Sequence, residues 1–389
     1  MSYLRLGIVA GVLLSAFVGA QTQDLRVGVI VSQSGLAARE GQAQAQAAAS
    51  LDEAWQNDFF AQRIDLLMRD DGSSPLAAAE LTRELLESGV HALVCCTTSE
   101  ALAIAAPIAQ DAGVLLLSPS ALPEDTLSQD ALSQDNAWAF SVRPDTPALV
   151  RSALLQLSRL DRASVGLMAL NTELGDEVLA LLERLSVPGG AELLGTQRYR
   201  PSINVLTPEA LWIATRQPGA VFVWGEDRDT RLALAALRER GFEGPVLQRP
   251  GTTPLTGSSQ LISPYEFAAD LSEDHPSFES LATFERNLAQ LYGPGRSTLE
   301  GAYLYDALLL VKAGLEQALV YGVDPTNTER FRSALYDAFL ASGEVTGVTA
   351  VFDFEAGSFS GVEPYSLLLV TRTARGLELF SDLAEDTTP

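Results

Sequence analysis

The sequence predicts an α/β protein built from two similar lobes with a cleft between them. Short β-branched runs alternate with longer amphipathic stretches from Leu25 onward, and the same alternation starts again at Ser164. Strands that are separated by one helix each pair in parallel, because a hairpin cannot return the chain in the same direction. The chain has 389 residues, 47% of them hydrophobic, which is enough for two or three domains with sizeable cores.

The first unit begins with four candidate strands, which are Arg26–Val31, Ile64–Met68, Ala92–Cys96 and Val114–Leu117. Helical patterns lie between them. Helix starts are marked at Ser74 before Pro75 and at Thr146 before Pro147, because proline at the first helical position loses no needed hydrogen bond. We therefore expect a parallel sheet covered by helices.

The second unit repeats this pattern, with candidate strands at Val165–Leu170, Glu192–Tyr199, Ala220–Trp224 and Val246–Gln248. Helical patterns from Glu177 and Thr230 lie between them, and Thr207 before Pro208 marks a further helix start. In open parallel sheets, ligands bind at the carboxyl ends of the strands. The cleft between the two units is therefore the expected site.

The pattern changes after Gly251. Residues Gly251–Ser259 are rich in Thr, Ser and Gly and predict a linker, and helices are expected at Phe278–Leu291, Leu299–Leu319 and Glu329–Leu340. Beyond them, Thr349–Phe354 and Tyr365–Thr371 predict a strand pair around a turn at 357–361. The acidic tail, residues 381–389, is expected to be frayed.

The N-terminus has the features of a secretory signal peptide, which we assign to residues 1–20. Arg5 supplies the positive charge, Leu6–Val18 is apolar, and Val18-Gly19-Ala20 provides the small residues of a cleavage site. A membrane anchor is the competing interpretation, but a span needs roughly 20 apolar residues. We therefore expect a mature chain that starts near Gln21 and is periplasmic or otherwise extracytoplasmic.

The net charge and the lack of catalytic or metal-binding motifs disfavour several classes of function. The net charge of −24 repels phosphate backbones, which disfavours nucleic-acid binding. The only histidines, His91 and His275, are expected at a strand boundary and in an acidic loop, away from any triad or zinc ligand set. Asp70-Asp71-Gly72 predicts a turn rather than a calcium loop, and Ser32-Gln33-Ser34-Gly35 is not a dinucleotide motif. No catalysis, metal or cofactor is expected.

The two cysteines, Cys95 and Cys96, are adjacent at the end of a candidate strand. A disulfide between them is one interpretation. The other, which the sequence favours, is a pair of small apolar residues that end a buried strand.

Polar residues follow two neighbouring strands. Thr97-Thr98-Ser99-Glu100 leads from a strand into a helix, where hydroxyls and free backbone N–H groups suit a carboxylate. A capping box of Thr97 with Glu100 is the alternative explanation. The next strand ends in Leu117-Ser118-Pro119-Ser120-Ala121, which brings a second polar loop to the same sheet edge and favours a binding site.

The order of several weak motifs resembles that of the type I periplasmic binding proteins of the branched-chain amino acid family, receptors of ATP-binding cassette (ABC) importers. The motifs are Val27-Gly28-Val29, Ser34-Gly35, Asp70-Asp71-Gly72-Ser73-Ser74-Pro75, Gly89-Val90, Ser99 with Ala103 and Pro107, Ser118-Pro119-Ser120-Ala121, Gly301-Ala302-Tyr303, Tyr305-Asp306-Ala307, Val345-Thr346-Gly347 and Phe352-Asp353.

This resemblance implies a two-lobed type I periplasmic binding protein fold whose lobes are joined by three hinge crossings. The N-terminal lobe would take residues 24–143 and 268–342, and the C-terminal lobe 144–267 and 343–380. Such proteins close around a small solute without changing it chemically, and a membrane permease senses the closed state. We expect a monomer that binds a small polar solute and docks to an ABC permease.

The resemblance also assigns candidate ligand-binding residues. The loops that match Thr98, Ser99, Ser118, Ser120 and Ala121 hold the ligand carboxylate in relatives, and Ser34 is added from the first loop. Aromatic positions of the family are matched by Glu40, Leu174 and Glu226.

The acidic residue that pairs with a ligand amino group falls near Arg249 or Pro250. Glu226 could replace it, or Arg249 could pair with a second acidic group of the solute. The alternative is that Glu40, Glu226 and Arg249 are solvated loop charges.

Three functions remain at this point. The leading hypothesis is solute capture for an ABC importer. The second is a ligand-sensing or scaffold lobe pair that docks to another protein without delivering solute, since one fold serves both roles. An enzyme, suggested only by Glu40 and Glu226, is the weakest.

Overall fold

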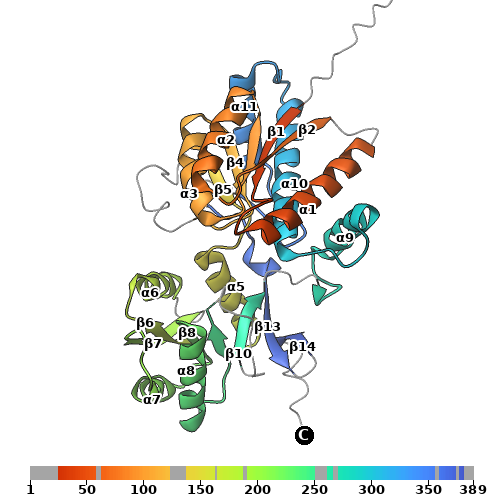
Figure 1. Cartoon of the computed structure of the whole chain (residues 1–389). Coiled ribbons are helices and arrows are strands. Elements are labelled where there is room, and N and C mark those ends of the chain that lie inside the picture. Colours follow the sequence, from red (N-terminus) through yellow and green to blue (C-terminus); the bar gives the residue numbers. More distant parts are fainter. Residues whose placement is uncertain are drawn as a thin grey trace, which may run out of the picture.

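The chain forms two α/β lobes (Figure 1). The computed structural model describes residues 25–57, 63–122, 137–162, 164–186, 191–249, 261–265, 270–354, 359–373 and 376–380. The predicted signal peptide (1–20), the predicted linker (Gly251–Ser259) and the predicted frayed tail (381–389) lie outside these residues. Within them, no helix has both the length and the apolar character needed to cross a membrane.

The first sheet has five parallel strands in the order β2-β1-β3-β4-β5. They are β1 (Leu25–Val31), β2 (Ile64–Asp70), β3 (Ala92–Cys95), β4 (Leu115–Ser118) and β5 (Ala139–Ser141). The four predicted strands are confirmed to within two residues at each end. β5, which has three residues, was not predicted.

Among the described residues, six helices pack in this lobe around one hydrophobic core. They are α1 (Ala38–Asn57), α2 (Pro75–Glu87), α3 (Ser99–Asp111), α9 (Phe278–Tyr292), α10 (Leu299–Val320) and α11 (Thr328–Leu340). α10 is apolar on nearly all sides and is buried as a result. The predicted start of α2 is confirmed, since the hydroxyl of Ser74 accepts a hydrogen bond from the backbone N–H of Ala77.

The second sheet has the order β14-β13-β10-β9-β8-β6-β7. Its parallel strands are β6 (Ser164–Leu170), β7 (Glu192–Tyr199), β8 (Ala220–Trp224), β9 (Val246–Gln248) and β10 (Leu261–Tyr265), and the antiparallel ones are β13 (Leu368–Thr373) and β14 (Gly376–Leu379). Helices α5 (Thr146–Arg159), α6 (Glu173–Leu185), α7 (Thr207–Ala214) and α8 (Asp227–Glu239) cover its two faces. The four strands predicted for this unit are confirmed.

The chain passes between the lobes three times: from β5 to α5, from β10 to α9, and from the segment after Phe352 to β13. This arrangement confirms the predicted fold class. The first crossing is held by Asp145, whose carboxylate caps α5 by accepting a hydrogen bond from Ala148 N at 2.8 Å. The cap is thus one residue earlier than the predicted Thr146.

The predicted pairing of Thr349–Phe354 with Tyr365–Thr371 is wrong. β12 (Val351–Phe352) pairs with β11 (Val345–Thr346), whereas β13 pairs with β10 and β14. Each segment lies where its apolar side chains are buried. Phe352 and Phe354 pack in the core of the first lobe, although the sequence assigned 343–380 to the second, while Val370 packs in the second lobe.

Asp306 on α10 holds this returning segment in place. Its side chain is completely buried and accepts three hydrogen bonds, from Val348 N at 2.5 Å, Thr349 N at 2.9 Å and the Thr349 hydroxyl at 2.7 Å. Burial raises the pKa of Asp306 to about 7, although the hydrogen bonds from Thr349 and Val348 act in the opposite direction. One carboxyl therefore satisfies the backbone of the loop that brings β12 into the first core.

Candidate functional site

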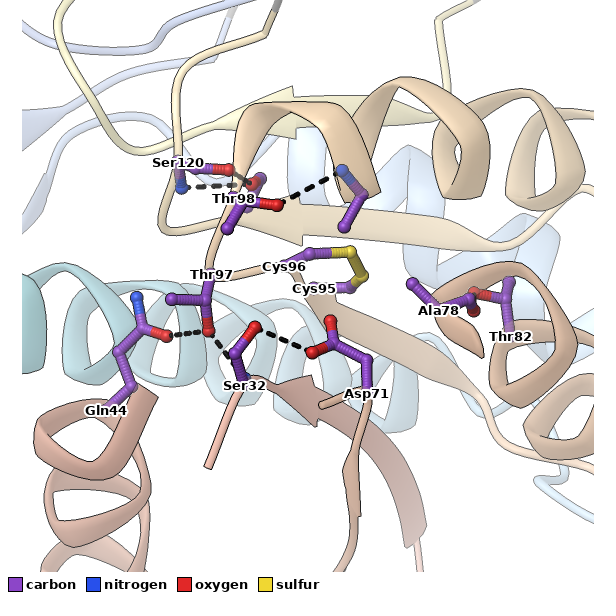
Figure 2. The surroundings of a disulfide bond; sticks show 12 residues. Ser32, Gln44, Asp71, Ala78, Thr82, Cys95, Cys96, Thr97, Thr98 and Ser120 are labelled. Carbon is purple, nitrogen blue, oxygen red and sulfur yellow. Dashed lines mark hydrogen bonds between the residues drawn. A yellow bond between two sulfur atoms is a disulfide. The ribbon is translucent and has the colours of Figure 1, made fainter. Parts of the chain in front are cut away.

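The carboxyl ends of β1, β3 and β4 meet at one edge of the first sheet, because these strands are parallel neighbours. Figure 2 shows this edge, where Ser32 follows β1, Thr97 and Thr98 follow β3, and Ser120 lies in the loop after β4. The structure thus brings the two predicted polar loops together. It also shows which of their hydroxyl groups are already engaged.

Thr97 connects the end of β1 to α1. Its hydroxyl accepts a hydrogen bond from Ser32 N at 2.8 Å and donates one to Gln44 Oε1 at 2.6 Å (Figure 2). The alternative explanation, a capping box of Thr97 with Glu100, is therefore wrong. The cap of α3 is Thr98, one residue later, whose hydroxyl accepts from Ala101 N at 3.3 Å.

Residues 118–120, at the end of β4 and in the loop after it, are buried and satisfy their own polar groups. Ser118 Oγ accepts from Ser120 N at 3.0 Å and lies 3.1 Å from Ser120 Oγ, while the Ser141 hydroxyl donates to Ser120 O at 3.0 Å. Ala121 is exposed. Ser118 and Ser120 consequently fix the loop, and a ligand would have to share their hydroxyls.

Ser99 differs from these residues. It is the first residue of α3, it is half-buried, and its hydroxyl has no hydrogen-bond partner within the described residues. The first backbone N–H groups of a helix have no partner inside the helix and carry a partial positive charge. Of the predicted carboxylate-binding hydroxyls, that of Ser99 is the one without a partner among the described residues, while the Thr98 hydroxyl accepts one bond and can still donate.

Ser34 is exposed and ties two loops together. Its hydroxyl donates to Asp70 Oδ2 at 2.7 Å and its N–H donates to Asp70 Oδ1 at 3.2 Å. Slight burial alone would raise the pKa of Asp70, but hydrogen bonds from Gly72 N and Ser34 outweigh it and lower the pKa. The predicted turn at Asp70-Asp71-Gly72 is present, with Gly72 at a φ of +60°.

In the second lobe, Glu226 and Arg249 follow neighbouring strands and contact each other. Arg249 Nη2 lies 3.4 Å from Glu226 Oε1, and Arg249 Nε donates to Gly225 O at 3.3 Å. The Glu226 side chain is 67% exposed, so the ion pair contributes only about 0–1 kcal/mol to stability. Glu226 also precedes α8 and shares a capping box with Asp229.

The other two predicted positions are less informative. Glu40 lies in the first turn of α1 and is half-buried. It precedes Gly41, where a Cβ atom would stand 2.0 Å from Ser32 O, so the helix passes very close to the β1 loop. Leu174 packs partly against the cores of its own lobe.

Tyr199, which the sequence analysis did not single out, is the last residue of β7 and its hydroxyl lies next to Gly225, the residue before Glu226. It is 2% exposed, and its hydroxyl is buried without a hydrogen-bond partner. Burial raises its pKa, and the negative charges of Asp229 and Glu226 raise it further. The signal for it is indirect: Gly225 is required here, because a Cβ atom would lie 2.1 Å from Tyr199 Oη.

We expect Gly225→Ala to lower the free energy of unfolding by about 1–3 kcal/mol, because the added methyl group overlaps Tyr199 Oη. Tyr199→Phe removes the overlapping atom, so the double variant should recover part of the loss. Urea denaturation of the four proteins in this cycle measures the coupling. Additive single effects would contradict the contact.

The two histidines hold their predicted positions, His91 directly before β3 and His275 in the loop before α9, but both are buried. His91 is 4% and His275 5% exposed. Nδ1 of His91 accepts from Arg26 N at 3.0 Å and Nδ1 of His275 accepts from Ser277 N at 3.1 Å, so each ring is neutral and its Nε2–H faces a backbone carbonyl, of Pro325 and Ser366 respectively. Neither ring is available for catalysis. Within the described residues, no cluster of His, Cys, Asp and Glu could hold a metal ion.

Because both imidazole rings are buried in the neutral form, we expect the folded protein to lose stability in acid. Burial lowers the pKa of both histidines below the ordinary value of 6.5, so the unfolded chain takes up protons first as the pH falls. Their contribution is complete above about pH 6.5 and decreases below it. Urea denaturation at pH 7 and pH 5 should show a larger loss for the wild type than for His275→Gln, whereas an equal loss would contradict this role.

Cys95 and Cys96 form a disulfide, and both are fully buried (Figure 2). The sequence favoured two unlinked apolar residues, and this interpretation is wrong. It failed because the end of β3 places the two side chains where their sulfur atoms bond, a local geometry that sequence spacing does not show.

Comparison with known proteins agrees with this architecture. A solved structure described as a putative branched-chain amino acid ABC transporter from Rhodospirillum rubrum superposes with a TM-score of 0.71 at 20% identity, covering 92% of this chain and 100% of that one. The substrate-binding protein LivJ from Streptococcus pneumoniae, in complex with isoleucine, gives 0.56 at 19% identity, covering 92% and 99%.

An extracellular ligand-binding receptor from Rhodopseudomonas palustris HaA2 gives a TM-score of 0.59 at 24% identity, covering 92% and 99%. The comparison with curated proteins finds no match. The family described as periplasmic binding protein matches residues 24–365, which is most of the sequence. On this match and on the two-lobed fold, the chain belongs to the periplasmic binding protein family.

Proposed function

We propose that the protein is the extracytoplasmic substrate-binding component of an ABC importer, which captures a small carboxylate-bearing solute between the carboxyl edges of its two sheets. Solute binding would close the lobes, and a membrane permease would sense the closed form. No chemical change of the solute is involved. The observation that carries the proposal is the free hydroxyl of Ser99 at the start of α3 in a member of this family.

The carboxyl edge of the first sheet is suited to binding a carboxylate of the solute. Ser99 presents its hydroxyl beside the first N–H groups of α3, where the helix dipole favours negative charge. Thr97 and Thr98 hold this turn in place through their bonds to Ser32 N and Ala101 N. The site is therefore organised before the ligand arrives, which reduces the entropic cost of binding.

The carboxyl edge of the second sheet is suited to binding a cationic group of the solute. Three carboxylates lie at the start of α8, those of Glu226, Asp227 and Asp229, whereas Arg249 is already paired with Glu226. A ligand ammonium would gain from this excess of negative charge. A second carboxylate would first have to separate Arg249 from Glu226. We therefore favour an amino acid over a dicarboxylic acid.

The test is the melting temperature of the mature protein across amino acids, dicarboxylates, amides and aromatic acids, because a ligand that binds only the folded state raises it. Glu226→Gln should weaken the binding of an amino acid, whereas Arg249→Gln should weaken the binding of a dicarboxylic acid. If no compound shifts the melting temperature of folded protein free of co-purified ligand, solute capture is wrong. Product formation from a bound compound would contradict a non-enzymatic role.

Export is part of the same proposal. Residues 1–20 would direct secretion and be removed, and the lobes would then meet their solute outside the cytoplasm. The mass of the protein recovered from the extracytoplasmic fraction tests this. A mass that includes residues 1–20 would contradict cleavage.

A further inference from the structure

The Cys95–Cys96 disulfide adds little to global stability by the usual route. A disulfide stabilises mainly by restricting the unfolded chain, and this effect grows with the length of the loop that it closes. A bond between adjacent residues closes the shortest loop available. Its effect must therefore be local, on the backbone that it includes.

This backbone leads directly into the candidate ligand site. Cys95 ends β3, which lies between β1 and β4, and Cys96 is followed by Thr97, Thr98 and Ser99. Figure 2 shows the disulfide next to the turn that carries Thr97 and Thr98. The ring that the sulfur atoms close thus fixes the direction in which the chain leaves the sheet.

The disulfide is so closely packed that breaking it must move the neighbouring atoms. Both cysteines are 0% exposed and belong to the hydrophobic core of the first lobe. Two sulfur atoms that are no longer bonded separate to van der Waals contact, and a close-packed interior cannot absorb this change in place. The following residues 97–99 are only half-buried, and this is where the backbone can move.

We propose that the Cys95–Cys96 disulfide positions Thr98 and Ser99 for ligand binding, so that solute affinity depends on its redox state. This inference rests on the proposed function. A dithiol reductant breaks the S–S bond: it supplies two electrons and two protons, each cysteine becomes a thiol, and the reductant becomes a disulfide. The dithiol form relaxes the turn and weakens the bonds of Thr97 to Ser32 N and of Thr98 to Ala101 N.

The experiment compares oxidised protein with protein reduced by dithiothreitol, using the compound that gives the largest shift in melting temperature. Calorimetry should show a roughly tenfold higher Kd after reduction. Alkylation followed by mass spectrometry confirms that both thiols have formed, and circular dichroism confirms that the protein remains folded. The matched control, Cys95→Ala with Cys96→Ala, should bind weakly and should not respond to the reductant.

Equal affinity of the oxidised and fully reduced proteins would overturn the inference. If no compound binds either form, solute capture fails instead, and hydrogen exchange still tests the positioning role. Reduction should accelerate amide exchange in a peptide containing Thr97–Ala101 and leave β8 unchanged. Unchanged exchange at Thr97–Ala101 would overturn the inference without any ligand, and the reduced wild type provides this result even if the double variant does not fold.

Discussion

Replacing Asp306 by alanine should lower the free energy of unfolding by about 3–5 kcal/mol. The carboxyl is fully buried and accepts hydrogen bonds from Val348 N, Thr349 N and the Thr349 hydroxyl. Alanine leaves these donors buried without a partner and opens a cavity beside α10. Urea denaturation measures the loss.

Asp337→Ala on the exposed face of α11 is the matched control and should change stability by less than about 0.5 kcal/mol. Asp306→Asn keeps the shape but turns an acceptor into a donor that faces a backbone N–H, so it should also be destabilising. An alanine variant within about 1 kcal/mol of the wild type would show that the loop is held by other contacts.

The pH dependence of stability is a second test of the role of the Asp306 carboxyl. Burial raises the pKa of Asp306 to about 7 in the folded protein, against 3.8 for a solvent-exposed aspartate. The folded state therefore binds the extra proton, and the contribution of Asp306 falls as the pH rises from about 4 to 7. Wild type should lose stability relative to Asp306→Asn across this window.

Replacing Ser99 by alanine should raise the Kd for the solute by about 10- to 100-fold, which is the value of a hydrogen bond to a charged group. Ser99 is the residue of choice because its hydroxyl has no partner within the described residues, so the substitution removes no protein contact that the structure shows. Calorimetry with the best compound from the melting-temperature panel measures the change.

Ser333→Ala is the control, since Ser333 is an exposed serine on α11 that bonds only within its own helix. Its Kd should equal that of the wild type. The melting temperature of both variants without ligand should be close to normal. If Ser99→Ala binds as tightly as Ser333→Ala, the carboxylate does not lie at the start of α3.

The fold was largely predictable because its signals are local. The eight strands expected in the two α/β units and the cap at Ser74 all follow from periodicity and turn chemistry within a few residues. β5 and β14 were not predicted, although β9, which has only three residues, was. The pairing of β13 depends on which core receives Leu369 and Val370, and this is a property of the whole chain.

The meeting of the two polar loops could be predicted, but the contacts of their side chains could not. Parallel pairing of β3 with β4 guarantees that Ser99 and Ser120 reach one edge of the sheet. Sequence cannot show that Thr97 is occupied by Ser32 and Gln44, or that Arg249 meets Glu226, because these contacts join segments far apart in the chain. The orphaned hydroxyl of Tyr199 is likewise visible only in three dimensions.

The return of Phe352 and Phe354 to the first lobe has a consequence for biosynthesis. A ribosome that has completed α11 has made every strand of the first sheet, yet the core still lacks the aromatic side chains that close it. Lobes usually fold in the order in which they are synthesised. Here the first lobe is completed only by residues near the end of the chain, so the nascent lobe stays incompletely folded until late in synthesis.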